Sequence, residues 1–114
     1  MSKPPERVVA RVEQRIREHI QKKWSARVES FSVRSRASFV YVDVRFAGDE
    51  ELEDEDGPQP LFRLRYLGSE EVWEFAFFSW SRGINGSYEL SYLNNGQPVG
   101  TPEACFDCAA FVWQ

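Results

Sequence analysis

The chain has 114 residues, of which 42% are hydrophobic and 15% aromatic, and it carries a formal net charge of −4. A chain of this size can bury a core without disulfide or metal staples, so we expect a single domain over residues 1–114, with no cofactor and no metal. It has no apolar run of about 18 residues and no apolar signal region, and its two cysteines are too few for a secreted disulfide scaffold. These features predict a cytoplasmic protein with no membrane partner.

Residues 5–24 are expected to form an amphipathic helix. Ile16, Ile20 and Trp24 follow one another at intervals of four residues and make one apolar stripe, while arginines and lysines occupy the opposite face. His19, the only imidazole in the chain, lies at the edge of this stripe. We interpret it as a boundary residue rather than a general base, because the chain has neither a nucleophile elbow nor a Gly-rich phosphate loop.

From Ala26 to Phe46 the hydrophobic period changes to two, which predicts two strands. Residues 49–60 follow them with seven acidic side chains, a Gly-Pro pair and no periodicity. This segment is expected to be a flexible acidic loop. Its spacing lacks the alternating ligand positions of an EF-hand calcium loop, so we do not expect a calcium site there.

Three more strands are expected over residues 61–67, 72–80 and 88–93, separated by Gly-containing turns. The stretch Val72–Trp80 carries large apolar side chains at both odd and even positions. A strand of this kind is buried on both sides. A helix, a partner subunit or a ligand could provide the second cover, and the sequence leaves this choice open.

The final helix has a clear start signal, because Thr101 can cap it, Pro102 fits its first turn and Glu103 complements its dipole. Its remaining residues are apolar on nearly all sides, which predicts a position deep in the core or in an interface. Cys105 and Cys108 have the spacing of a redox pair. We interpret them as small core residues, because they lie inside a capped helix rather than at its N-terminus.

The order of elements predicts an α+β fold: an N-terminal amphipathic helix, a five-stranded antiparallel meander and a C-terminal helix, with both helices packed on one face of the sheet. The other face would then be open. By strand parity we expect it to present these side chains: Phe39, Tyr41, Asp43, Arg45, Arg63, Arg65, Glu74, Phe78 and Trp80. The charged members, together with Glu89, could form a ladder of cross-strand ion pairs.

No motif predicts a reaction, so we favour a small non-enzymatic interaction module that binds a protein partner, or itself as a homodimer, through an aromatic-rich surface. Nine Phe, four Trp and four Tyr are more aromatic residues than one short chain easily buries. The negative net charge disfavours nucleic acid as a partner, whereas a small-molecule ligand stays possible. The candidate ligand-binding residues are Trp24, Tyr41, Trp73, Phe78, Trp80 and Tyr88.

Two alternatives belong to other functional classes. One is a cone-shaped ligand-binding or enzymatic domain with an apolar pocket and a few convergent polar groups, His19 with Tyr41 or Tyr88. The aromatic lining expected for that pocket is Trp24, Trp73, Phe75, Phe77 and Tyr92. The other is an acidic inhibitor or decoy, in which residues 49–56 mimic a phosphate backbone.

Overall fold

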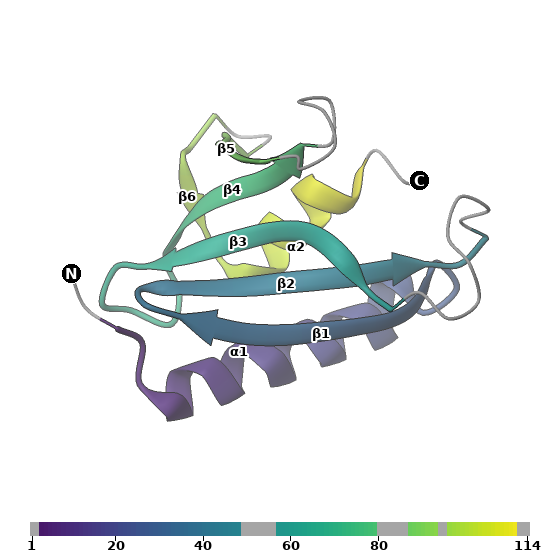
Figure 1. Cartoon of the computed structure of the whole chain (residues 1–114), viewed down its shortest axis with the longest axis horizontal. Helices are drawn as coiled ribbons and strands as arrows, with labels where there is room; N and C mark the ends of the chain where they lie inside the picture. Colours follow the sequence, from purple (N-terminus) through teal and green to yellow (C-terminus); the bar gives the residue numbers. More distant parts are fainter. Residues whose placement is uncertain (1–2, 49–56, 80–86, 94–95, 112–114) are drawn as a thin grey trace.

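The computed structural model describes residues 3–48, 57–79, 87–93 and 96–111, and it confirms the expected α+β fold (Figure 1). In chain order the elements are α1 (Glu6–His19), a π-helix (Ile20–Trp24), β1 (Val28–Arg36), β2 (Phe39–Phe46), β3 (Gln59–Tyr66), β4 (Trp73–Ser79), β5 (Ser87–Leu90), β6 (Val99–Gly100) and α2 (Pro102–Ala110).

All strand pairs are antiparallel, and the sheet has the meander order β1-β2-β3-β4-β5, with the short strand β6 also paired to β4. Both helices pack on the same face of this sheet, α1 toward β1 and α2 toward β3 and β4. In Figure 1 they lie behind the strands. The two-layer arrangement therefore matches the expected one, with one sheet face free of helices.

The hydrophobic core fills the space between the helices and the sheet. The apolar stripe of α1 and the alternating apolar side chains of β2 are both part of it, so both periodicities correctly identified the buried faces. Phe106 of α2 is fully buried and packs edge-on against the rings of Trp24 and Phe62. Thr101 caps α2 as expected, its hydroxyl accepting a hydrogen bond from the backbone N–H of Ala104 at 3.2 Å.

Two polar clusters hold the helices in place. Arg15 of α1 donates hydrogen bonds to both carboxylate oxygens of Glu103 at 2.8 Å, and it also reaches Glu71 at 3.0 Å. The second cluster is centred on Asp107 of α2. Its carboxylate contacts the following groups: His19 Nε2 at 2.7 Å, Trp24 Nε1 at 2.8 Å and Lys23 Nζ at 3.0 Å. His19 is the last residue of α1, and Lys23 and Trp24 belong to the π-helix that follows, so the junction of the two helices brings all three side chains to Asp107.

Several expected boundaries need correction. The acidic loop was expected to reach residue 60, but β3 already begins at Gln59, and residues 49–56 lie outside the described residues. The register between β2 and β3 shifts at this point, because Val42 pairs with Phe62 but Asp43 pairs with Pro60. A bulge of this kind tolerates proline, which cannot donate to the ladder.

The fifth strand ends at Leu90 rather than at residue 93, and β6 was not expected at all. β6 has only two residues, which is too short for a periodicity signal. No helix in the described parts of the chain combines the length and the apolar character needed to cross a lipid bilayer.

Candidate functional site

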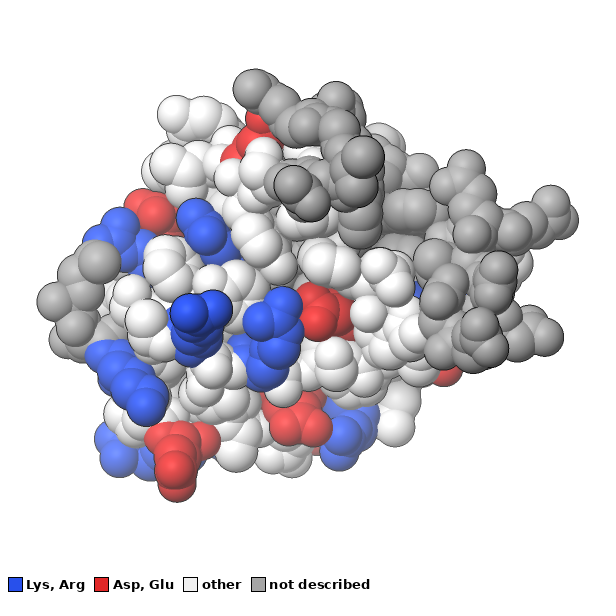
Figure 2. Space-filling view, viewed as in Figure 1, with Lys and Arg blue, Asp and Glu red and all other residues white. Residues whose placement is uncertain are grey.

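The sheet face opposite the helices gathers the polar and aromatic side chains of five strands, and we call it the open face. Antiparallel partners in register point to the same side of a sheet, so the pairing of Tyr41 with Arg34 and Arg63, and of Phe78 with Tyr88, assigns these residues to it. Figure 2 views the molecule from this side and shows Lys and Arg gathered over part of it, with acidic and uncharged side chains between them.

Guanidinium groups and aromatic rings interleave at the centre of the open face. The guanidinium carbon of Arg63 lies 4.3 Å from the ring centroid of Phe39 and 5.0 Å from that of Tyr88. The guanidinium carbon of Arg34 lies 4.5 Å from the ring of Tyr41. All three separations are those of cation–π contacts.

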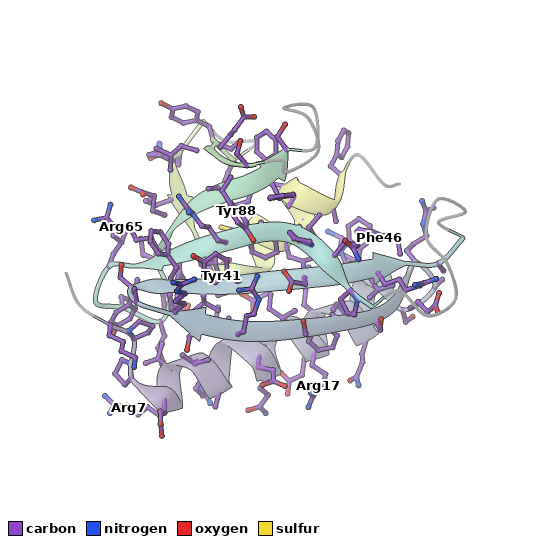
Figure 3. The ribbon with its side chains drawn as sticks, viewed as in Figure 1. Arg7, Arg17, Tyr41, Phe46, Arg65 and Tyr88 are labelled. Atoms are coloured by element: carbon purple, nitrogen blue, oxygen red, sulfur yellow. The ribbon has the colours of Figure 1, made fainter. Side chains whose placement is uncertain are left out.

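The aromatic rings also contact one another across the strands. Tyr88 packs against Tyr41 with centroids 5.4 Å apart and against Phe78 at 5.0 Å, while Phe39 lies 6.1 Å from Tyr41. Figure 3 shows Tyr41 and Tyr88 on the same side of the ribbon, although β3 and β4 separate their strands. We refer to Arg34, Phe39, Tyr41, Arg63, Phe78 and Tyr88 as the arginine–aromatic cluster.

The expected ladder of ion pairs is present in part. Asp43 pairs with Arg34 at 3.2 Å, and Glu74 pairs with Arg65 at 3.7 Å. Glu29 of β1 lies 3.6 Å from Arg45. Arg63 differs from these arginines, because it has no ion pair and no hydrogen bond within the described residues.

The net charge of the open face is positive, although that of the chain is negative. Its described charged side chains are the arginines Arg34, Arg36, Arg45, Arg63 and Arg65 and the acids Asp43 and Glu74, with Glu29 reaching in from β1. Five arginines against three acids leave an excess of two positive charges. This charge favours anionic ligands at short range.

Asp43 Oδ1 and the hydroxyl of Tyr88, both on this side of the sheet, are buried and have no hydrogen-bond partner within the described residues. Asp43 is only 9% exposed. Burial raises the pKa of Tyr88 above its ordinary value of 10, and the negative charge of Asp43 raises it further. The Tyr88 hydroxyl is therefore protonated at neutral pH and can both donate and accept a hydrogen bond.

The assignment of Glu89 to the ion-pair ladder was wrong. β5 pairs with β4 so that Glu89 is opposite Phe77 and Tyr88 is opposite Phe78, which puts Tyr88 on the open face and Glu89 on the other side. A shift of one residue in register exchanges the two faces of a strand. Alternation within the strand alone could not determine which register the preceding turn allows.

The candidate ligand-binding residues divide between the two sides of the sheet. Tyr41, Phe78 and Tyr88 come together in the arginine–aromatic cluster. Trp24 and Trp73 lie on the helix side, buried in the core, and Trp80 is outside the described residues. These six residues therefore do not form a single site.

The groups expected to converge in the cone-shaped pocket lie on two sides of the sheet. Its intended lining includes Trp24, Trp73 and Phe75, which pack into the core with at most 3% exposure. His19 is held by Asp107 on the helix side, whereas Tyr41 and Tyr88 are on the open face. Parity explains the difference, because the large side chains of β4 at odd positions point toward α2.

Sequence reasoning missed Arg34 and did not distinguish Arg63 from the other arginines. The signal was present in the alternation of β1, where Arg34 and Arg36 occupy the same parity as the serines that face away from the helices. Which arginines of the open face lie beside an acid depends on the pairing register. That register comes from the fold rather than from the residue pattern.

Metal and redox chemistry gain no support from the described residues. No group of three or more His, Cys, Asp or Glu side chains gathers there in a way that could hold a metal ion. Cys105 and Cys108 are both free thiols, and Cys105 is fully buried in the core.

Comparisons with protein-family models, with curated proteins and with solved structures found no match for this chain.

Proposed function

We propose that this protein is a non-enzymatic interaction module whose open face binds an acidic segment of a protein partner. The observation that carries the proposal is Arg63, whose guanidinium is stacked on Phe39 and Tyr88 and has no acid partner within the described residues. A guanidinium presents its donors around the edge of its plane, in a fork that matches a carboxylate. The two rings hold the guanidinium by its charge and apolar surface, and they use none of its N–H donors as a carboxylate would.

The surrounding rings prepare Arg63 for binding. Each cation–π contact contributes roughly 0.5 to 1 kcal/mol at a partly exposed site, so two of them restrict a side chain that otherwise has many rotamers. Tyr88 is itself held by Tyr41 and Phe78. A fork that is already ordered loses less entropy when the carboxylate arrives, and preorganisation of this kind increases affinity.

The charge of the open face favours a different protein over a second copy of the same chain. If two open faces met, their excess positive charges would oppose each other. An acidic partner segment reverses the sign of this interaction. The rings of the arginine–aromatic cluster add apolar contact area, which suits a peptide better than an isolated ion.

Nucleic acid fits this face less well. Arg34, Arg45 and Arg65 each lie near an acid, so they neutralise carboxylates of the protein itself rather than a row of phosphates. Single-stranded nucleic acid also needs free ring faces on which its bases can stack. Guanidinium groups already cover one face of Phe39 and of Tyr41.

Binding to synthetic peptides tests the proposal. The probes are fluorescein-labelled nine-residue peptides with one to four glutamates, compared by anisotropy with matched peptides that carry glutamine. We expect the wild-type protein to prefer the glutamate peptides, and Arg63→Gln to weaken binding by about 10-fold to 100-fold, the equivalent of one charge-assisted hydrogen-bonded pair.

The control variant is Arg7→Gln, which removes the same charge from an exposed position on α1, on the other side of the molecule (Figure 3). It should leave the affinity nearly unchanged. Equal binding of glutamate and glutamine peptides, or an equal loss in both variants, would contradict the proposal. A mass that doubles with concentration in sedimentation, with no peptide binding, would indicate self-association instead.

A further inference from the structure

The open face carries a second arginine whose donors no acid of the described chain uses. Arg36 is exposed, and within the described residues it has no ion pair, hydrogen bond or cation–π contact. It differs in this from Arg34 and Arg65, each of which lies beside an acid. Together with Arg63, Arg36 gives the open face two guanidinium groups that can each receive a carboxylate from a ligand.

The register of the strands determines how far apart these two arginines lie. Arg36 ends β1 and pairs with Phe39 across a short turn, and Phe39 pairs with Arg65 of β3. Arg63 lies two residues before Arg65 on the same face of β3. Two strand spacings of about 4.8 Å and one step of about 6.7 Å along the strand put the Cα atoms of Arg36 and Arg63 roughly 12 Å apart. The two arginines therefore lie on opposite sides of β2.

An aromatic surface lies between the two arginines. The line that joins them crosses β2 between Phe39 and Tyr41, which are both partly exposed and whose ring centroids are 6.1 Å apart. The guanidinium of Arg63 already lies against Phe39, at 4.3 Å from the ring centroid. Along this line the open face thus presents a positive charge, an apolar surface and a second positive charge.

An extended peptide matches this order of groups. Its side chains alternate, so residues i, i+2 and i+4 point to the same side, and residues i and i+4 are about 13 Å apart. Carboxylates at i and i+2 are only about 7 Å apart, which is too short. A helical segment needs about eight residues to span 12 Å, and a helix of that length is marginal in water. The extended form is therefore the less costly one.

On the basis of the function proposed above, we infer that the open face recognises an extended partner segment with the pattern acidic–x–apolar–x–acidic. Arg63 and Arg36 bind the two carboxylates, and Phe39 and Tyr41 contact the apolar side chain between them. Arg36 is thus a specificity-determining residue. The spacing of the acids, rather than their number, determines which acidic segment binds most tightly.

A set of nine-residue peptides of equal composition tests the spacing. Each fluorescein-labelled peptide has glutamates at positions i and i+n, with n from one to seven, in a background of serine, and anisotropy gives its affinity. We expect n of four to bind best, by about 2-fold to 5-fold, the range for one exposed ion pair. Leucine at i+2 of that peptide should strengthen binding by a further 3-fold to 10-fold or so, because its side chain is partly buried on the rings.

A double-mutant cycle assigns each carboxylate to its arginine. Replacing one of the two glutamates by glutamine should cancel the effect of Arg36→Gln, and replacing the other should cancel that of Arg63→Gln. Because Arg36 is exposed at the end of β1, we expect Arg36→Gln to leave the urea midpoint nearly unchanged. Arg7→Gln is again the control and should couple to neither glutamate.

The outcomes separate failure of this pattern from failure of the proposed function. Arg63-dependent binding that does not vary with spacing, or no coupling of Arg36 to either glutamate, would overturn the pattern and leave the acidic-segment proposal intact. So would a maximum at another spacing, such as the seven positions of two helical turns. If no glutamate peptide binds in a way that depends on Arg63, both proposals fail.

Discussion

Arg15 and Arg63 have the same side chain but different neighbours, because Arg15 contacts acids and Arg63 contacts aromatic rings. Arg15 is largely buried between α1, α2 and the turn after β3, and its donors are used by Glu103, Glu71 and the backbone carbonyl of Glu70. Arg63 has rings on its faces and no acid partner in the described chain. The first holds the fold together, and the second is the residue on which the proposed function depends.

The two cysteines provide a prediction at the same scale. Burial raises the pKa of Cys105 to about 12 and also raises that of Cys108, whose thiol is only half-buried. Because the thiolate is the reactive form, we expect Cys105 in the folded protein at pH 8 to be inert to iodoacetamide and Cys108 to react slowly. Mass spectrometry after timed labelling measures this. The Cys108→Ser protein should stay unlabelled until urea unfolds it, and rapid labelling of that variant would show that Cys105 is accessible.

At the scale of elements, α2 is the part that completes the core. It packs against both α1 and the sheet, so the rings of Trp24, Phe62 and His19 all meet the same Phe106. Sequence alone predicted a helix at this place and expected its end, including Trp113, to be packed. Trp113 lies outside the described residues. Phe106, on the same helix, is described and fully buried.

Phe106→Ala should therefore lower the free energy of unfolding by about 3 to 5 kcal/mol, the range for removing a fully buried Phe. The matched control is Phe111→Ala at the end of the same helix, where the ring is 64% exposed. Its effect should stay within about 0.5 kcal/mol. Urea unfolding of both variants measures the difference. Similar midpoints would mean that α2 is peripheral to the core.

For the whole molecule, stability depends on acidic side chains of α2 that hold α1 in place. Burial by itself would raise the pKa of Glu103, but the hydrogen bonds from Arg15 outweigh it and keep this pKa below 4.5. Burial likewise opposes ionisation of Asp107, and the hydrogen bonds from His19, Trp24 and Lys23 lower its pKa below 3.8. Both carboxylates therefore bind protons more weakly in the folded chain than in the unfolded one.

The sign of the pH dependence follows from these shifts. The ionised carboxylates of Glu103 and Asp107 stabilise the folded chain fully above about pH 4.5. This stabilisation is lost as the pH falls through their lowered pKa values in the folded state. We expect urea midpoints to decline below about pH 4.5, and Glu103→Gln to make this decline shallower. Glu6→Gln, which removes the same charge from an exposed site at the start of α1, should leave the slope unchanged. A wild-type stability that is flat down to pH 3 would contradict this account.

Part of the candidate site was predictable from the residues. Alternation along β2 correctly placed Tyr41 on the face away from the helices, and the same reasoning placed Phe78 there from β4. Tyr88 was among the candidates and lies in the arginine–aromatic cluster, but the side of the sheet assigned to its strand was wrong. Alternation gives relative positions within one strand, whereas the register between strands decides which side is which.

The sequence by itself determined the order of helices and strands, the start of α2 at Thr101 and the buried stripe of α1, because these depend on periodicity and capping between near neighbours in the chain. Only the tertiary structure decided that Arg63 lies within cation–π distance of both Phe39 and Tyr88 and lacks an acid partner among the described residues. It also decided that Asp43 Oδ1 and the Tyr88 hydroxyl are buried on one face. These relations join residues far apart in sequence, and they depend on strand register, a bulge in β3 and the curvature of the sheet, none of which a local pattern encodes.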